Sequence, residues 1–243
     1  MLRPFLSIII PAYNEESRLP DTLSRVASFL DEQIYSSEVL IVDNNSTDQT
    51  AEIIREFTNR NSNFKGLLEK EPGKGAAVKC GMLKAQGEFL FMCDADLSMP
   101  IEEVNKFLPP QLEGVDIAIA SREAHGAIRY DEPLFRHLGG RLMNFLIQLF
   151  ALPGFNDTQC GFKCFSASTA KQLFQHQTLS GWSFDIELLY IARQRGFTIS
   201  EIPIPWIYHQ ESKVNAFRDA IKILLDIKTI RRNKIQGLYD PEN

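Results

Sequence analysis

Apolar runs alternate with amphipathic segments through the first half of the chain. The runs are short and rich in β-branched and aromatic residues, which is typical of strands buried on both faces of a parallel sheet. They occupy residues 5–10, 38–42, 64–68, 89–93 and 116–120. Strands that alternate with helices predict an α/β fold, in which a mostly parallel sheet carries helices on both faces.

The segments between these runs have the apolar spacing of helices. Leucines recur on one side of residues 19–30, and the polar stretch 46–48 offers capping groups to the next helix. A third helix is predicted over 75–85, with Gly87 placed to end it. Pro100 predicts a short helix after the fourth strand.

The second half of the chain is less regular. Its predicted elements are a helix over 134–152, a strand over 158–165, helices over 167–174 and 184–195, an extended segment over 197–206 and a last helix over 214–234. Gly196 is placed to end the fourth of these elements. Pro203 and Pro205 lack a backbone donor, which favours a sheet edge for the extended segment.

Composition excludes several classes of protein. The 243 residues carry 26 basic and 31 acidic side chains, a net charge of -5, and 44% of them are apolar. This is ordinary globular usage without the basic excess of nucleic-acid binding. No apolar run reaches the ~18 residues of a membrane span, and the N-terminus lacks the pattern of a signal peptide. We therefore expect a soluble, intracellular protein with no nucleic-acid partner.

The charge is unevenly distributed along the chain. Residues 213–234 carry a net charge of +5, which leaves -10 on the rest. Apolar residues line one side of the same segment, at Val214, Phe217, Ile221, Leu224 and Ile227. A basic amphipathic helix of this kind either lies on an anionic membrane surface or packs on the protein with a solvated basic face. The pattern favours neither.

Polar, acidic sequences follow three of the predicted strands. They are 11–15, 43–48 and Asp94-Ala-Asp96. The carboxyl ends of parallel strands share one edge of a sheet, so the three loops are expected to meet in one crevice. Two carboxylates two residues apart after a buried strand are hard oxygen ligands for Mg²⁺ or Mn²⁺, ions that often take substrate phosphate as well.

Other kinds of site lack their motifs. The first strand is not followed by the glycine pattern of a dinucleotide site, and no P-loop is present. The four histidines are scattered, which leaves a hydrolase triad unsupported. Cys80 and Cys93 lie in apolar runs as core residues do, and Cys160 and Cys164 have no second Cys or His pair for zinc.

The loops taken together resemble those of the family 2 inverting glycosyltransferases, which have a nucleotide-sugar-binding GT-A type fold. The resembling motifs are Ile-Ile-Ile-Pro-Ala-Tyr-Asn-Glu, Val-Asp-Asn-Asn-Ser-Thr-Asp, Gly-Lys-Gly and Asp-Ala-Asp. Residues 157–163, 182–187 and 211–214 resemble the polyprenyl-phosphate, or dolichyl-phosphate, glucosyltransferase branch. The resemblance runs in order from about residue 5 to 215.

The resemblance implies a donor site. The positions that match uridine or ribose contacts are Pro11, Tyr13, Glu15 and Asp43. Lys74 matches a basic position near the nucleotide, and Lys213 matches a loop that reaches the diphosphate. Asp94 and Asp96 match the motif that holds Mg²⁺ or Mn²⁺ and the diphosphate.

The resemblance implies an acceptor site as well. Arg122 and Arg136 match basic residues that receive the acceptor phosphate, and a guanidinium suits that group. Asp157 and Gln159 match the sugar and reaction centre. A lipid phosphate is largely ionised at neutral pH, so Asp157 is expected to orient groups rather than to act as a strict base. Asp185 serves either this site or the start of its helix.

Trp182 and Phe184 stand beside this motif. Each could stack on sugar, and the sequence favours a place in the core for both. Ser98 stands where some mannosyl-transferring relatives carry a glutamine ligand, which favours glucose.

The expected activity is metal-dependent, inverting transfer of glucose from UDP-glucose to a polyprenyl or dolichyl monophosphate. The alternatives are a GDP-mannose-dependent polyprenyl-phosphate mannosyltransferase, a family 2 transferase with a soluble glycan acceptor, and a binding module without turnover. The predicted organisation is a catalytic domain over 1–212, with a nucleotide-sugar half over 1–122 and an acceptor half over 123–212, then a basic helix and tail over 213–243.

Many relatives carry a membrane-spanning helix, and no such segment is apparent in this chain. The enzyme is therefore expected to be peripheral on the cytoplasmic face of a membrane. The helices over 134–152 and 214–234 would lie against the membrane. A homo-oligomer, or a partner that supplies a membrane anchor, is a further expectation.

Overall fold

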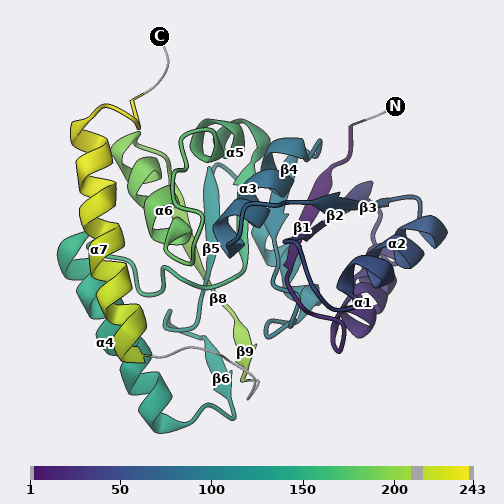
Figure 1. Ribbon diagram of the computed structural model, residues 1–243, viewed down its shortest axis with the longest axis horizontal. Coiled ribbons are helices and arrows are strands. Elements are labelled where there is room, and N and C mark those ends of the chain that lie inside the picture. Colours follow the sequence, from purple (N-terminus) through teal and green to yellow (C-terminus); the bar gives the residue numbers. More distant parts are fainter. Residues whose placement is uncertain (1–2, 209–215, 241–243) are drawn as a thin grey trace.

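The computed structural model describes residues 3–208 and 216–240. Its centre is a seven-stranded sheet with the order β3-β2-β1-β4-β7-β5-β8 (Figure 1). The strands are β1 (Leu6–Ala12), β2 (Ser37–Asp43), β3 (Phe64–Leu68), β4 (Phe89–Met92), β5 (Ile117–Ser121), β7 (Lys163–Ser166) and β8 (Ile199–Pro203). Every strand except β7 runs in the same direction, so the predicted mostly parallel sheet is confirmed.

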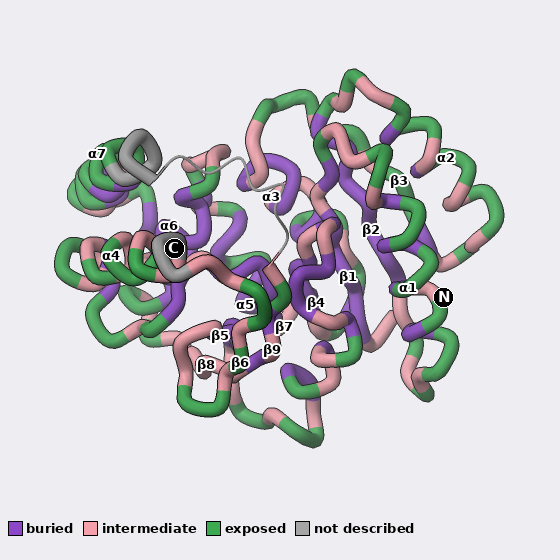
Figure 2. Tube along the Cα trace, turned by 90° about the horizontal axis from the view of Figure 1, so that it is seen from below, coloured by how far each residue is buried: buried purple, intermediate pink, exposed green. Residues whose placement is uncertain are grey.

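Helices cover both faces of the sheet (Figure 2). On one face pack α1 (Leu19–Asp31), α2 (Thr50–Arg60) and the 3-10 helix η1 (Ile101–Phe107). On the other pack α3 (Lys74–Lys84), α5 (Ala167–Phe174) and α6 (Phe184–Gln194). Alternate residues of β1 serve the two cores: Ile8 and Ile10 face the first and Ile9 faces the second. The apolar runs are continuous because both faces are buried.

The antiparallel strand β7 was not predicted in its place. It lies between β4 and β5, so the two strands that are consecutive in the parallel series do not pair. A small second sheet joins β6 (Ile128–Tyr130) to β9 (Pro205–Ile207). The edge position predicted from Pro203 is confirmed, because β8 ends the strand order.

Two glycines that were assigned to helix ends behave differently. Gly196 follows α6 with a φ of +74°, as predicted. The prediction for Gly87 was wrong: α3 ends at Lys84 and passes into an extended Ala85. A Cβ at Gly87 would lie 2.5 Å from the hydroxyl of Ser7, so close approach of the two backbones requires glycine here.

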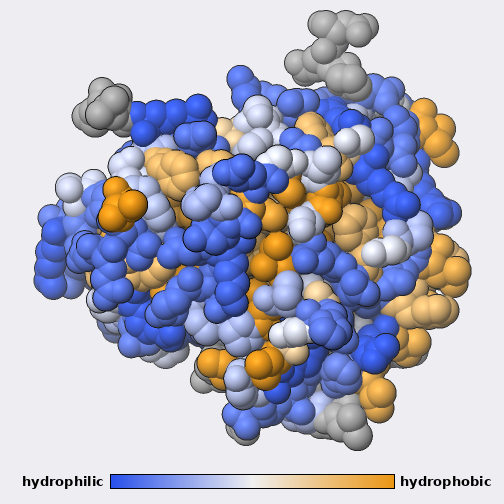
Figure 3. All heavy atoms as spheres, turned by 180° about the vertical axis from the view of Figure 1, so that it is seen from behind, coloured by the Kyte–Doolittle hydropathy of each residue, from blue (hydrophilic) through white to orange (hydrophobic). Residues whose placement is uncertain are grey.

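Helices α4 (Leu134–Phe150) and α7 (Ala216–Ile235) pack together at the edge of the molecule opposite α2 (Figure 1). Ile147 faces inward and is 1% exposed. The opposite side of α4 carries an exposed apolar row, which we call the outer row: Leu138, Leu142, Phe145 and Leu149, between 58% and 62% exposed. Figure 3 shows apolar side chains along this edge, on the right in the reversed view.

Helix α7 buries Ile223, Ile227, Ile230 and Asn233. Of the residues predicted to form its apolar side, Ile227 is buried, whereas Ile221 and Leu224 are 49% and 39% exposed. Val214 and the side chain of Phe217 lie outside the described part of the structure. Within the described part of the chain, no helix combines the length and the apolar character that a membrane crossing needs.

Candidate active site

The loops after β1 and β2 are joined by hydrogen bonds. Asn14 adopts a left-handed φ of 53°, its N–H donates to Ser46 Oγ (3.0 Å), and its Oδ1 accepts from the Thr47 N–H (2.8 Å). The Ser46 N–H donates in turn to Asp43 Oδ1 (3.0 Å). The two predicted nucleotide loops therefore form one wall, as the rule for parallel strand ends requires.

The four predicted uridine contacts lie on this wall. Pro11 pairs with Val42 within the sheet, and Asp43 is buried at the end of β2. Tyr13 is 54% exposed, which leaves its ring open to a ligand. The Glu15 carboxylate lies 2.5 Å from Arg18 Nε at the start of α1.

Asn44 connects this wall to the start of α3. Its amide Nδ2 donates to the carbonyls of Glu69 (3.1 Å) and Glu71 (2.7 Å), and its Oδ1 accepts from the Gly73 N–H (2.7 Å). The Gly73 turn has a φ of +128°, which only glycine adopts readily. Asn44 thus fixes the residue that follows this turn, Lys74.

Lys74 meets the first carboxylate of the Asp94-Ala-Asp96 motif. Its Nζ lies 2.5 Å from Asp94 Oδ1, with the two side chains 13% and 25% exposed. Burial works to lower the pKa of Lys74, but the charges of Asp94, Asp185 and Asp96, with the hydrogen bond to Asp94, together outweigh it and the pKa is raised. Lys74 is therefore a firmly charged ammonium beside the predicted diphosphate site.

The residues after β4 offer oxygen ligands for a cation. Asp96 Oδ1 accepts from the Ser98 N–H (2.9 Å), and Leu97 between them has a φ of 43°, a strained conformation of the kind found at functional sites. A Cβ on Gly161 would lie 1.8 Å from Asp94 Oδ2, so only a glycine at 161 lets the Asp94 carboxylate lie against the backbone there. The two carboxylates are hard oxygen ligands, which fit a divalent ion that completes its shell with phosphate oxygens. No cluster of three His, Cys, Asp or Glu ligands occurs among residues 3–208 and 216–240.

Arg122 and Asp157 form a bidentate ion pair. Arg122 Nε and Nη2 donate to the two Asp157 oxygens at 2.6 and 2.9 Å, and the Arg122 backbone N–H adds a third bond at 3.1 Å. Burial works to raise the pKa of Asp157, but Arg122 outweighs it and the pKa is lowered. Asp157 is thus a bound carboxylate, which suits an orienting group better than a base.

The arginine is also held from its other side. The face of Trp206 lies 5.4 Å from the Arg122 guanidinium and 5.7 Å from that of Arg129. Arg129 Nη1 donates to Glu132 (2.6 Å), and its Nε donates to the Arg122 carbonyl (3.2 Å). These contacts give the Arg122 side chain one fixed orientation.

A buried pair lies between the two ion pairs already described. Lys163 Nζ is 2.8 Å from Asp185 Oδ1 and donates to the Cys160 carbonyl (2.5 Å), and both side chains are at least 95% buried. Burial raises the pKa of Asp185, partly offset by the charges of Lys163 and Lys74. A Cβ on Gly75 would lie 2.8 Å from Phe184 Cβ, so the start of α6, which carries Asp185, adjoins the start of α3, which carries Lys74.

The structure brings together many of the predicted site residues. Lys74 lies on Asp94, Arg122 lies on Asp157, and the half-buried Gln159 belongs to the turn that carries Gly161. Arg136 belongs to α4, and its side chain is outside the described part of the structure. Lys213 lies outside the described residues altogether.

Sequence reasoning missed three contributors. Asn44 and Gly161 are placed by contacts to Gly73 and Asp94 that no local pattern contains. Glu187 is fully buried and accepts from Thr178 and Leu179, which fixes the loop before α6. The core placement expected for Trp182 was wrong because it is 63% exposed, whereas that of Phe184 is confirmed at 0%.

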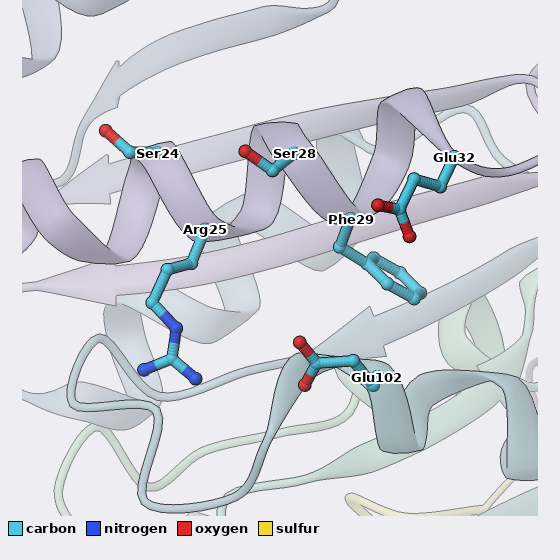
Figure 4. Close-up of a pocket in the computed structure, with 6 residues that line it drawn as sticks. All are labelled: Ser24, Arg25, Ser28, Phe29, Glu32 and Glu102. Carbon is cyan, nitrogen blue, oxygen red and sulfur yellow. The ribbon is translucent and has the colours of Figure 1, made fainter.

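A surface hollow lies apart from these residues. Figure 4 shows it between α1 and η1, with Arg25, Phe29 and Glu102 among the residues that line it. Its α1 residues come from the part of the helix that runs away from the carboxyl end of β1. The hollow therefore does not belong to the crevice at the strand ends.

Solved structures share the fold. Mannosyl-3-phosphoglycerate synthase from Rubrobacter xylanophilus gives a TM-score of 0.71 at 16% identity, over 97% of this chain and 76% of that one. Glucosyl-3-phosphoglycerate synthase from Mycobacterium tuberculosis, in complex with Mn²⁺, UDP and glucosyl-3-phosphoglycerate, gives a TM-score of 0.68 at 17% identity. This match covers 92% of this chain and 80% of that one. At such identity the likeness defines the fold class, which is the GT-A fold of glycosyltransferases.

Sequence relatives give the family. Glycosyl transferase family 2 matches residues 7–174. Dolichyl-phosphate beta-glucosyltransferase of Drosophila melanogaster is 36% identical, over 96% of this chain and 76% of the fly protein. The Homo sapiens protein of that name is 32% identical, over 96% of this chain and 77% of the human protein. The chain belongs to glycosyltransferase family 2 and is a glycosyltransferase, as the motifs predicted.

Proposed function

We propose that the protein transfers glucose, with inversion, from UDP-glucose to a dolichyl or other polyprenyl monophosphate, with Mg²⁺ or Mn²⁺ bound at Asp94 and Asp96. One observation carries the proposal: relatives named dolichyl-phosphate beta-glucosyltransferase match almost the whole chain at 31–36% identity. The glucose-transferring M. tuberculosis structure with Mn²⁺ and UDP supports the choice of donor and metal.

The chemistry follows from the two ion pairs. An oxygen of the acceptor phosphate attacks the anomeric carbon, and the bond from that carbon to UDP breaks. Lys74 meets the diphosphate, and a divalent cation at Asp94 and Asp96 would neutralise the charge that develops on UDP. Asp157 engages Nε and Nη2 of Arg122, so the Nη1 edge of the guanidinium is the part that meets the acceptor phosphate. Because that phosphate is already ionised, the site supplies position rather than a base.

The donor is tested with purified protein, a panel of UDP- and GDP-sugars and a short polyprenyl phosphate. We expect glycolipid from UDP-glucose, its loss with EDTA, its return with Mn²⁺ or Mg²⁺, and little product from Asp96→Asn. Glycolipid formed only from GDP-mannose would contradict the choice of glucose. Product from a soluble glycan alone would contradict the lipid acceptor.

The outer row of α4 is proposed to lie on the cytoplasmic face of a membrane, where a lipid acceptor is found. Its four large apolar residues recur at helical spacing and are all more than half exposed, and α7, which packs against α4, carries basic residues. Apolar side chains with adjacent cations suit an anionic bilayer surface. Phe145→Asp should reduce co-sedimentation with anionic vesicles, whereas Leu83→Asp, at an exposed leucine of α3, should not. Equal sedimentation of both variants would contradict this orientation.

A further inference from the structure

Trp182 is an exposed aromatic residue at the mouth of the site. The chain has two tryptophans; Trp206 is 8% exposed between two guanidinium groups, and Trp182 is 63% exposed just before α6. The Trp182 ring is both exposed and beside the Lys74 ammonium, so it is open to a ligand that binds at Lys74.

The loop that carries Trp182 is fastened on both sides. Ser183 Oγ donates to Asp226 Oδ2 on α7 (2.5 Å), and Ser180 Oγ donates to the Glu71 carboxylate. The Ala76 N–H donates to the Ser180 carbonyl (3.2 Å), an approach that glycine at 73 permits. The indole is therefore presented by a fixed loop rather than left on a loose one.

The position of the ring relates it to the donor. Lys74 Nζ lies 5.0 Å from the Trp182 ring centroid and 2.5 Å from Asp94 Oδ1. One cation thus connects the indole to the carboxylate proposed to hold the diphosphate. The predicted uridine contacts Asp43 and Tyr13 lie at the ends of β2 and β1, and Asn44 stands between Asp43 and the Gly73-Lys74 turn. The group of a nucleotide sugar that follows directly from the diphosphate on this side is the hexose.

We propose that Trp182 stacks on the hexose of the bound nucleotide sugar and helps to select it. A hexose with equatorial hydroxyls presents a face of C–H groups, and the negative face of an aromatic ring attracts them. The Lys74 ammonium lies against the same ring and holds the phosphate next to that sugar. This inference rests on the proposed function and adds a residue that contacts the sugar rather than the nucleotide.

Kinetics distinguish this role from a structural one. Trp182→Ala should raise KM for UDP-glucose about three- to tenfold and leave inhibition by UDP unchanged, and Trp182→Phe should recover most of the loss. Phe57→Leu, on α2, is a control that should alter neither constant. Equal weakening of UDP-glucose and UDP by Trp182→Ala would overturn hexose stacking.

Fluorescence gives a direct readout, because Trp182 is the exposed one of two tryptophans. Acrylamide should quench the wild-type emission far more than that of Trp182→Phe, which defines the Trp182 signal. We expect UDP-glucose with Mn²⁺ to protect this signal and UDP with Mn²⁺ to protect it much less. Equal protection by both, or none by UDP-glucose under conditions of active transfer, would overturn the proposal. Absence of UDP-glucose binding in calorimetry would instead overturn the proposed function, and this inference with it.

Discussion

The substitution Gly161→Ala tests the Asp94 site most sharply. A Cβ at this position would lie 1.8 Å from Asp94 Oδ2 and 2.4 Å from its Cγ. Ordinary contact begins at 3.4 Å, so the carboxylate must retreat by about 1.6 Å. A displacement of about 1 Å in a catalytic group costs about a hundredfold in rate, and we expect kcat to fall at least that far, about 2.7 kcal/mol.

The same change should have little effect on folding. The displaced group is the end of a side chain that is 25% exposed, so it can move without disturbing the core. We expect the free energy of unfolding to change by less than about 1 kcal/mol, within the usual range for substitutions outside the core. Loss of rate without loss of stability separates damage to the site from damage to the fold.

The assay measures transfer from labelled UDP-glucose to a short polyprenyl phosphate in detergent, with thermal unfolding recorded on the same protein. Gly140→Ala is the matched control, because a Cβ there meets nothing within 4 Å and Gly140 lies on the side of α4 away from the outer row. It should keep kcat and gain up to about 1 kcal/mol of stability. A folded Gly161→Ala protein with wild-type kcat would refute the role given to Asp94.

Three further predictions concern buried contacts. Gly87→Ala should lower the free energy of unfolding by about 1–3 kcal/mol and leave kcat unchanged, because a Cβ there would lie 2.5 Å from the buried hydroxyl of Ser7. Thermal unfolding measures the stability, and a turnover assay measures kcat. Glu38→Gln should cost about 1–3 kcal/mol at pH 7 in urea unfolding. Hydrogen bonds and an ion pair outweigh burial and lower the folded-state pKa of Glu38, so this cost should shrink as the pH falls and the wild-type carboxyl is protonated. Arg122→Met should lower the free energy of unfolding by about 3–5 kcal/mol, because it leaves the buried Asp157 carboxylate without its partner. Adding Asp157→Leu should restore stability but not activity.

Each of these predictions has a contrary outcome. Turnover lost in Gly87→Ala would mean that this contact shapes the site. If the loss of unfolding free energy in Glu38→Gln did not depend on pH, the charge of Glu38 would not be what stabilises the fold. Glu52→Gln is the control, because Glu52 forms an exposed ion pair with Arg55 and its loss should leave stability nearly unchanged. A double variant no more stable than Arg122→Met would contradict the argument from an uncompensated carboxylate.

Local patterns were sufficient for most elements of the fold. The helix predicted over 167–174 is α5 at its observed bounds, and that over 184–195 differs from α6 by one residue. The apolar spacing that marks these helices can be read within a short window of the sequence. The place of β7 is not decided that way, because its pairing with β4 and β5 joins residues far apart in the sequence.

The same distinction applies to the site. The carboxylates after β4 could be found from the sequence because a strand and a short motif mark them. Their partners could not: Lys74 reaches Asp94 because Asn44 holds the preceding turn, and Asp157 meets Arg122 across 35 residues. Trp182 shows the opposite error, since this aromatic residue was expected in the core and is 63% exposed.

Two of the cations expected to meet substrate phosphates, Lys74 and Arg122, are already paired with carboxylates. Lys74 lies on Asp94 and Arg122 lies on Asp157, so neither charge is left uncompensated in a poorly solvated crevice. The carboxylates also fix the rest position of each cation, which reduces the ordering that substrate binding must impose. Because the cations are shared, an incoming phosphate competes with a carboxylate for each of them. Removing either cation alone therefore has two effects: it weakens a phosphate contact, and it leaves an acid in the crevice without its partner.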